Sequence, residues 1–168
     1  MELIDKILEE FEDTYSETLK EYKVDEVDAL MMHYNQEITN LRQGDSLSND
    51  RLRYYMDRFS YQMYRLRTIK ARENLKANLT RHLHEKAHNH TLLNLEIPEG
   101  RKLIREEKMA LAALETANED KIAILYRAIS NAIDERIMGL DKMLYNLSTQ
   151  ANLNMSEARL INKGGHVT

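Results

Sequence analysis

Apolar residues recur at three- and four-residue steps along most of the chain, which is the period of an amphipathic helix. The first such stripe lies in residues 2–22, and the second lies in residues 27–41 and ends before Gly44. Residues 24–26 offer a break between the two. A third and longer helix is predicted over residues 48–90, which contain neither glycine nor proline.

The predicted long helix carries two stripes on roughly opposite faces. The apolar stripe needs a partner surface and consists of Leu52, Tyr55, Met56, Phe59, Met63 and Leu66. The other stripe alternates guanidinium and phenol groups and consists of Arg51, Tyr54, Arg58, Tyr61, Arg65 and Arg72. We expect the second stripe to point away from the surface that buries the first.

The apolar stripe changes direction in the far half of this helix. Leu75, Leu79 and Leu83 lie on a different face from Leu52 and Leu66, so this half must be buried against something else. Two alternatives remain open. Either the helix bends near residues 70–74, or it leaves its own bundle and packs against a copy of the chain.

The sequence Glu96-Ile97-Pro98-Glu99-Gly100 predicts a turn after the long helix. Beyond it, residues 101–150 are expected to form one or two helices, with a candidate break at residues 116–119. Ser156 is a candidate start of a last short helix before a frayed tail.

These patterns predict an all-α fold, namely an elongated, coiled-coil-like helical bundle with one long basic helix that associates with copies of itself. We expect one domain over residues 1–168. It would comprise an acidic helical hairpin (1–44), the long basic helix (48–90) and carboxyl-terminal helices (100–162). Five glycines and one proline, with 31% charged residues, disfavour a sheet-rich alternative.

The absence of cysteine excludes disulfides, thiolate catalysis and cysteine-ligated zinc, and it favours a reducing compartment. The chain also has no export signal and no long apolar run. We therefore expect a cytoplasmic protein, in the host cytoplasm if the protein is viral, with no membrane partner.

The net charge of −4 conceals a strong asymmetry. Residues 1–50 carry four Lys/Arg and fourteen Asp/Glu, for a net charge of −10. Residues 51–90 carry ten Lys/Arg and three Asp/Glu, for a net charge of +7. A basic block inside an acidic protein indicates a polyanion, an acidic partner or the chain's own amino-terminal segment as its counterpart.

The sequence His84-Glu85-Lys86-Ala87-His88 matches the H-E-x-x-H pattern of zinc metalloproteases. Lys86 places a charge inside the motif, and no extension leads from His88 to a third histidine ligand. We therefore expect no catalysis, no metal site and no cofactor. Whether the histidines bind a metal adventitiously stays open; they are His82, His84, His88 and His90.

The alternating arginines and tyrosines are the better candidate for function. Proteins hold single-stranded nucleic acid with basic side chains along the phosphates and aromatic rings against the bases. Tyrosine and arginine are equally favoured in protein interfaces, and this stripe could instead dock the acidic first helix.

The chain has the basic run Arg65-Leu66-Arg67-Thr68-Ile69-Lys70-Ala71-Arg72, then an irregular break and a long carboxyl-terminal helix that ends in a basic segment. This layout resembles the UvsY-type recombination mediators of tailed bacteriophages. The resemblance covers residues 63–159. It implies a ring-forming oligomer that binds single-stranded DNA and loads a recombinase onto DNA coated by single-strand-binding protein. It also implies phosphate contacts at Arg65, Arg67, Lys70, Arg72 and Lys76.

We therefore predict a non-catalytic, homo-oligomeric protein that binds single-stranded nucleic acid, with a recombinase or a single-strand-binding protein as further partners. The predicted contact residues are Arg51, Tyr54, Arg58, Tyr61, Arg65, Arg67, Lys70, Arg72 and Lys76. The alternative is a scaffold or connector of a viral assembly with protein partners only.

Overall fold

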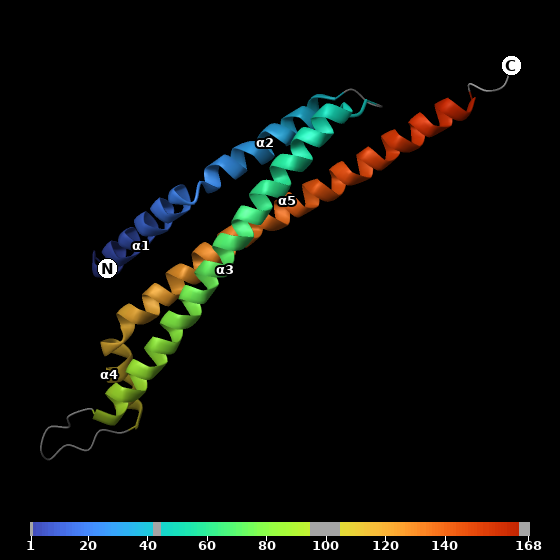
Figure 1. The fold of residues 1–168 in the computed structure, drawn as a ribbon. Helices are drawn as coiled ribbons and strands as arrows, with labels where there is room; N and C mark the ends of the chain where they lie inside the picture. Colours follow the sequence, from blue (N-terminus) through green and yellow to red (C-terminus); the bar gives the residue numbers. More distant parts are fainter. Residues whose placement is uncertain (1, 42–44, 95–104, 165–168) are drawn as a thin grey trace, which may run out of the picture. The chain divides into compact units, whose positions relative to one another are not determined.

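The computed structural model describes residues 2–41, 45–94 and 105–164, and every regular element in these ranges is an α-helix (Figure 1). The helices are α1 (Glu2–Glu21), α2 (Val24–Asn40), α3 (Asn49–Asn94), α4 (Arg105–Glu115) and α5 (Ala117–Gly164). The predicted all-α fold is confirmed. The predicted stop signal at Gly44 and the predicted turn at residues 96–100 lie outside the described residues.

The break between α1 and α2 falls at Lys23, one residue before the predicted one. Lys23 adopts a left-handed conformation with φ 51° and ψ 44°, which is unfavourable for a residue with a Cβ atom. Its N–H donates to the Lys20 carbonyl at 2.8 Å. Residues 24–26 form the first turn of α2 rather than the break, and Asp25 and Glu26 favour that turn through the helix dipole.

Helix α3 begins at Asn49, one residue after the predicted start, and Ser48 provides its cap. The Ser48 hydroxyl accepts a hydrogen bond from the Arg51 N–H at 3.3 Å, and the Ser48 carbonyl accepts one from Leu52 at 2.9 Å. The helix then continues to Asn94 without interruption at residues 70–74.

The break at Thr116 is also confirmed, since this residue separates α4 from α5. Its hydroxyl and its N–H both donate to the Ala112 carbonyl, at 2.9 and 3.2 Å. The short last helix predicted at Ser156 does not exist as a separate element. Good helix formers follow Ser156, so α5 continues through it to Gly164.

The described contacts divide the chain into two compact units. Unit 1 comprises Met1–Thr18 and Lys70–Asn131, and unit 2 comprises Leu19–Ile69 and Ala132–Thr168. Long helices α3 and α5 therefore contribute to both units. The single domain over residues 1–168 stays a prediction.

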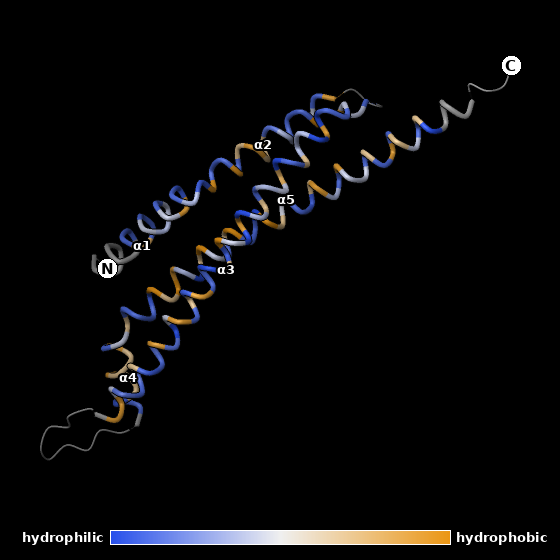
Figure 2. The backbone as a smooth tube through the Cα atoms, in the orientation of Figure 1, coloured by the Kyte–Doolittle hydropathy of each residue, from blue (hydrophilic) through white to orange (hydrophobic). Residues whose placement is uncertain are grey.

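Apolar residues recur at intervals along α2, α3 and α5 (Figure 2). Unit 2 has a core of apolar side chains, most of them large, that follow the predicted periodicity. Its buried members are Tyr22, Val24, Val27, Tyr34, Leu47, Leu52, Tyr55, Phe59, Leu66, Ala132, Ile133, Ile137, Leu140 and Leu147. The Tyr34 ring lies edge-on to Tyr55 and Phe59, with centroids 5.2 and 5.4 Å apart. Gly139 allows a close approach of α5 to α2, because a Cβ atom there would lie 3.1 Å from the Met31 sulfur.

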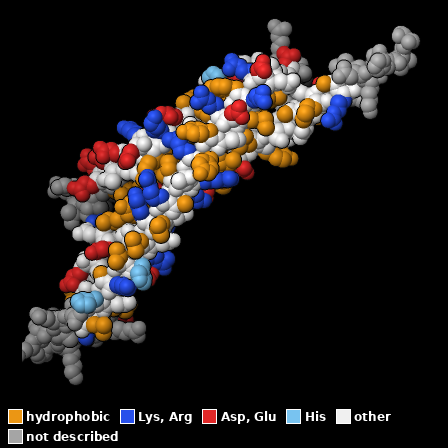
Figure 3. Space-filling view, viewed as in Figure 1, with side chains coloured by type: hydrophobic (Ala, Val, Ile, Leu, Met, Phe, Trp, Pro, Cys, Tyr) orange, Lys and Arg blue, Asp and Glu red, His pale blue; other side chains and the backbone are white. Residues whose placement is uncertain are grey.

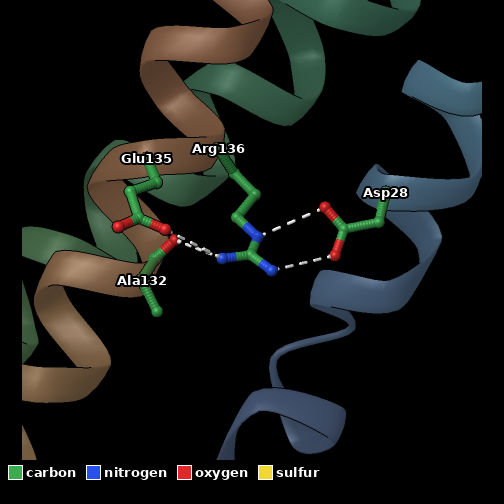
Figure 4. A network of polar contacts seen from close by, with 4 residues as sticks. All are labelled: Asp28, Ala132, Glu135 and Arg136. Carbon is green, nitrogen blue, oxygen red and sulfur yellow. Dashed lines mark hydrogen bonds and ion pairs between the residues drawn. The ribbon is translucent and has the colours of Figure 1, made fainter.

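An ion pair joins α2 to α5 within unit 2 (Figure 4). Arg136 presents Nε and Nη2 to the two carboxylate oxygens of Asp28, at 3.2 and 3.1 Å. The same guanidinium also lies within 3.2 Å of the Ala132 carbonyl and 3.5 Å of Glu135. This parallel geometry orients the two helices more strictly than a single contact does.

A double-mutant cycle between Asp28→Asn and Arg136→Met should give a coupling energy of about 1 kcal/mol, because the pair is bidentate but partly solvated. The measurement is urea unfolding at low and high salt, and the coupling should shrink at high salt. A coupling near zero at both salt concentrations would show that the pair does not stabilise the fold.

Unit 1 has a core that differs in kind. The buried surface of α3 in this unit carries Glu73 and Ala77. Ala112 of α4 and Ala123 of α5 are small buried residues, and Ile129 of α5 is the large apolar side chain buried with them. The Ser130 hydroxyl donates to the Asn74 side-chain oxygen at 2.6 Å. Small side chains let helices approach closely but bury little apolar surface, so this unit gains less from the hydrophobic effect than unit 2.

The leucines of α3 in unit 1 lie on the outside of the described structure. Leu75, Leu79 and Leu83 have exposed fractions of 68%, 57% and 53%. The prediction that this stripe is buried is therefore not met within one chain. Helix α3 is continuous through residues 70–74. The choice between a bend in this helix and packing of its far half against a copy of the chain stays open.

Helix α1 is strongly acidic and weakly buried. Figure 3 shows its carboxylates gathered on the surface, and no residue described from 9 to 21 is buried. Across the described ranges, no helix is long and apolar enough to cross a membrane.

Candidate nucleic-acid interface

The candidate interface is the outer face of α3 within unit 2. Burial of Leu52, Tyr55, Phe59 and Leu66, each at most 2% exposed, fixes the rotation of this helix against α2 and α5. Residues about half a turn away must then face outward, because side chains three and four residues apart share one side of a helix.

Three of the predicted contact residues lie on this outer face. Tyr54 is 42% exposed, Tyr61 is 63% exposed, and Arg58 is exposed between them. The Arg58 guanidinium carbon lies 5.6 Å from the centre of the Tyr54 ring, within the range of a cation–π interaction. A guanidinium and a phenol held together in this way present a positive charge and a flat ring side by side.

Arg65 does not belong to the outer face, contrary to the prediction. Its Nη1 and Nη2 donate to the carbonyls of Tyr22 and Lys23, at 2.8 and 3.0 Å, and its Nε donates to Gln62 at 2.8 Å. The side chain therefore satisfies the carbonyls exposed by the left-handed turn between α1 and α2. This is a structural role.

Arg51 is also engaged within unit 2. It lies 3.3 Å from Glu37, a residue of α2, while its own side chain remains 54% exposed. The acidic amino-terminal segment thus neutralises one end of the predicted stripe. For Arg51, the counterpart of the basic helix is therefore the chain's own acidic segment.

The basic residues that follow along α3 differ in how free they are to contact a phosphate group. Arg67 is exposed, and it has no carboxylate partner among the described residues. In unit 1, Lys76 lies 2.9 Å from the buried Glu73 and 5.1 Å from the centre of the Tyr126 ring. Arg72 also contacts Glu73, at 3.5 Å, and Lys70 is half-buried. Of the five phosphate contacts implied by the resemblance, Arg67 is the most available.

Two residues of this face were not predicted from the sequence. Tyr64 is 75% exposed, the largest value among the exposed tyrosines of α3, and Arg53 is exposed as well. Tyr64 lies three residues after Tyr61, so the helical spacing already placed it on the same side. Asp57 shares the face and lowers its positive charge.

A polar network beneath this face holds Tyr55. Burial, followed by a hydrogen bond to Glu37, raises the pKa of Tyr55 to about 12. Its hydroxyl lies 2.6 Å from Nδ1 of His33. The Tyr55 phenol therefore stays neutral at any physiological pH, and these contacts hold it inside unit 2.

The described residues hold no group of three or more His, Asp or Glu side chains arranged for a metal ion. Comparison with models of known families, with curated proteins and with solved structures finds no match. The resemblance to UvsY-type mediators and the absence of catalysis stay predictions.

Proposed function

We propose that this protein is a non-catalytic, single-stranded nucleic-acid-binding protein whose contact surface is the outer face of α3 in unit 2. That surface consists of Arg53, Tyr54, Arg58, Tyr61, Tyr64 and Arg67. One observation carries the proposal: the three tyrosines are 42%, 63% and 75% exposed, and the arginines beside them have no carboxylate partner in the described ranges.

The chemistry of this surface favours a flexible strand over a rigid duplex. Exposed phenol rings can stack on bases only where the bases are not already paired and stacked. The arginines contribute sequence-independent affinity by releasing counterions from phosphates. A convex helix face of this kind has no donors fixed for base edges, so we expect little sequence preference.

The test is a titration of labelled single-stranded and duplex oligonucleotides with the protein at several salt concentrations. We expect preference for the single strand and release as salt rises. Three phosphate contacts on a single strand give a slope of about −2 in log K against log [salt]. Absence of binding at low salt, or a slope near zero, would contradict the proposal.

The finer role follows the resemblance to UvsY-type mediators. An oligomer that orders a single strand along several copies of α3 would help load a recombinase onto DNA coated by single-strand-binding protein. This role rests on the proposed binding, and an assay of recombinase assembly on coated DNA tests it separately.

A second candidate function is structural, as a scaffold that assembles copies of the chain. It is favoured by the leucine face of unit 1, defined by Leu75, Leu79 and Leu83 of α3. These leucines are more than half exposed while Glu73 and Ala77 of the same helix are buried. Exposed apolar stripes of this kind mark interaction sites, and most soluble oligomers contain copies of one chain.

We expect the protein to sediment as an oligomer and Leu75→Glu/Leu79→Glu to shift it to monomer, because carboxylates cannot be buried unpaired in such a seam. Analytical ultracentrifugation measures the change. Asn78→Glu, at an exposed position next to the face, is the matched control and should leave the oligomer intact. A monomeric wild type would exclude self-association through this face.

A further inference from the structure

Two histidines of α3 form a cluster in unit 1 that the proposed function does not use. His84 and His88 lie one helical turn apart, and both are partly buried. Their ring centroids are 6.0 Å apart and their planes differ by 28°. Two imidazoles at this spacing on one helix face the same side.

The structure fixes the proton of His84. Its Nδ1 lies 3.0 Å from the carbonyl oxygen of Thr116, the residue between α4 and α5. A carbonyl only accepts hydrogen bonds, so Nδ1 must donate and a neutral His84 carries its lone pair on Nε2. A backbone carbonyl on one ring nitrogen is the usual arrangement for a histidine whose other nitrogen binds a metal.

The second histidine, His88, has a buried ring nitrogen without a hydrogen-bond partner among the described residues. This nitrogen is Nδ1. A buried polar atom without a partner is unfavourable. A cation held between the two rings would supply the missing interaction.

The distance between the rings is compatible with one shared ion. A metal about 2.1 Å from a ring nitrogen lies roughly 3.2 Å from the ring centre, so rings on one ion have centres up to ~6.4 Å apart. The observed 6.0 Å falls inside this limit. A cavity of about 390 Å³ borders His84, and its other lining residues are Arg81, Glu85, Asp120, Ala123, Ile124 and Arg127. This cavity gives water access to the His84 side of the site.

We infer that His84 and His88 bind one divalent ion of borderline softness, with Zn²⁺ as the representative. Two imidazole nitrogens are the protein ligands and water completes the shell, because the described residues offer no third ligand group. An open site of this kind is exchangeable. Binding should stabilise the carboxyl-terminal part of α3 and its contact with Thr116.

The test is a Zn²⁺ titration of the full chain, purified without a histidine tag, by calorimetry and thermal unfolding. We expect one ion per chain and a raised Tm. The variant His84→Ala/His88→Ala should bind at least about tenfold more weakly. The matched control is His82→Ala/His90→Ala, which removes the same number of histidines from the same helix and should bind like the wild type.

A second measurement uses only the wild-type protein and so does not depend on the folding of a variant. It is NMR of the histidine ring nitrogens during the Zn²⁺ titration. Zn²⁺ should shift the ring nitrogens of His84 and His88 before those of His82 and His90. Equal losses in the two double variants, equal shifts at all four rings, or no stoichiometric binding would each overturn the inference. None of these outcomes bears on nucleic-acid binding.

Discussion

The double variant Arg58→Glu/Arg67→Glu is expected to lose single-stranded oligonucleotide binding by more than tenfold at low salt while keeping its helicity. Both residues are exposed, and neither has a carboxylate partner in the described part of the chain. Loss of two phosphate contacts would already reduce the magnitude of the slope of log K against log [salt] by about 1.4. The two new carboxylates would in addition repel the phosphates. Fluorescence anisotropy over a salt series measures both the affinity and the slope.

The matched control reverses two exposed cations elsewhere, Lys121→Glu/Lys142→Glu, and changes the net charge by the same amount. We expect this variant to bind much as the wild type does at moderate salt, because distant surface charges are screened. A similar loss in both variants would mean that only the overall charge matters and that the face of α3 is not a site.

Replacing Tyr61 and Tyr64 by alanine separates stacking from charge. Loss of a base–aromatic stack weakens binding by about 1–3 kcal/mol per base, and it should leave the salt slope unchanged. An unchanged affinity would show that the phenol rings do not contact bases, and it would favour a protein interface for this face.

The sequence predicts the fold of unit 2 well, because its core follows a simple period. Leu52, Phe59 and Leu66 lie at seven-residue steps, and each is buried. A periodic pattern of large apolar residues determines which side of a helix is inside. The break at Thr116 was also recognisable from residue type.

The partners of individual side chains were not predictable in this way. Periodicity places Arg65 on the same side as Arg58, yet a guanidinium on a long flexible chain can reach round the helix. It turns to the carbonyls of Tyr22 and Lys23, which are 43 and 42 residues away in sequence. Nothing in the local sequence of α3 indicates that these carbonyls need a donor.

Unit 1 departs further from the pattern. The apolar stripe of its α3 segment is exposed at Leu75 and Leu79, while Glu73 is fully buried and contacts Lys76 at 2.9 Å. The hydrophobic pattern of this segment predicts buried leucines and an exposed glutamate. Periodicity alone does not show which side of a helix its neighbours leave uncovered, so the outward direction of these leucines was not predictable from the pattern.

The variant Phe59→Ala is expected to lower the free energy of unfolding of unit 2 by about 3–5 kcal/mol. Phe59 is fully buried, and its ring lies 5.4 Å from that of Tyr34 and 5.6 Å from that of Tyr55. Truncation removes the burial of the ring, two aromatic contacts, and the packing that orients α3 against α2. Urea unfolding followed by far-ultraviolet circular dichroism measures the loss.

Tyr61→Ala is the matched control, because it removes a ring of similar size two residues away that is 63% exposed. We expect it to change the stability by no more than about 0.5 kcal/mol. Since the chain has no tryptophan, near-ultraviolet dichroism reports mainly on tyrosine rings, and the signal of the Tyr34–Tyr55 pair should weaken in Phe59→Ala alone. Equal stabilities of the two variants would mean that the inner and outer faces of α3 have been assigned wrongly. The candidate interface would then lose its physical basis, because its exposure follows from the burial of Phe59 on the opposite side.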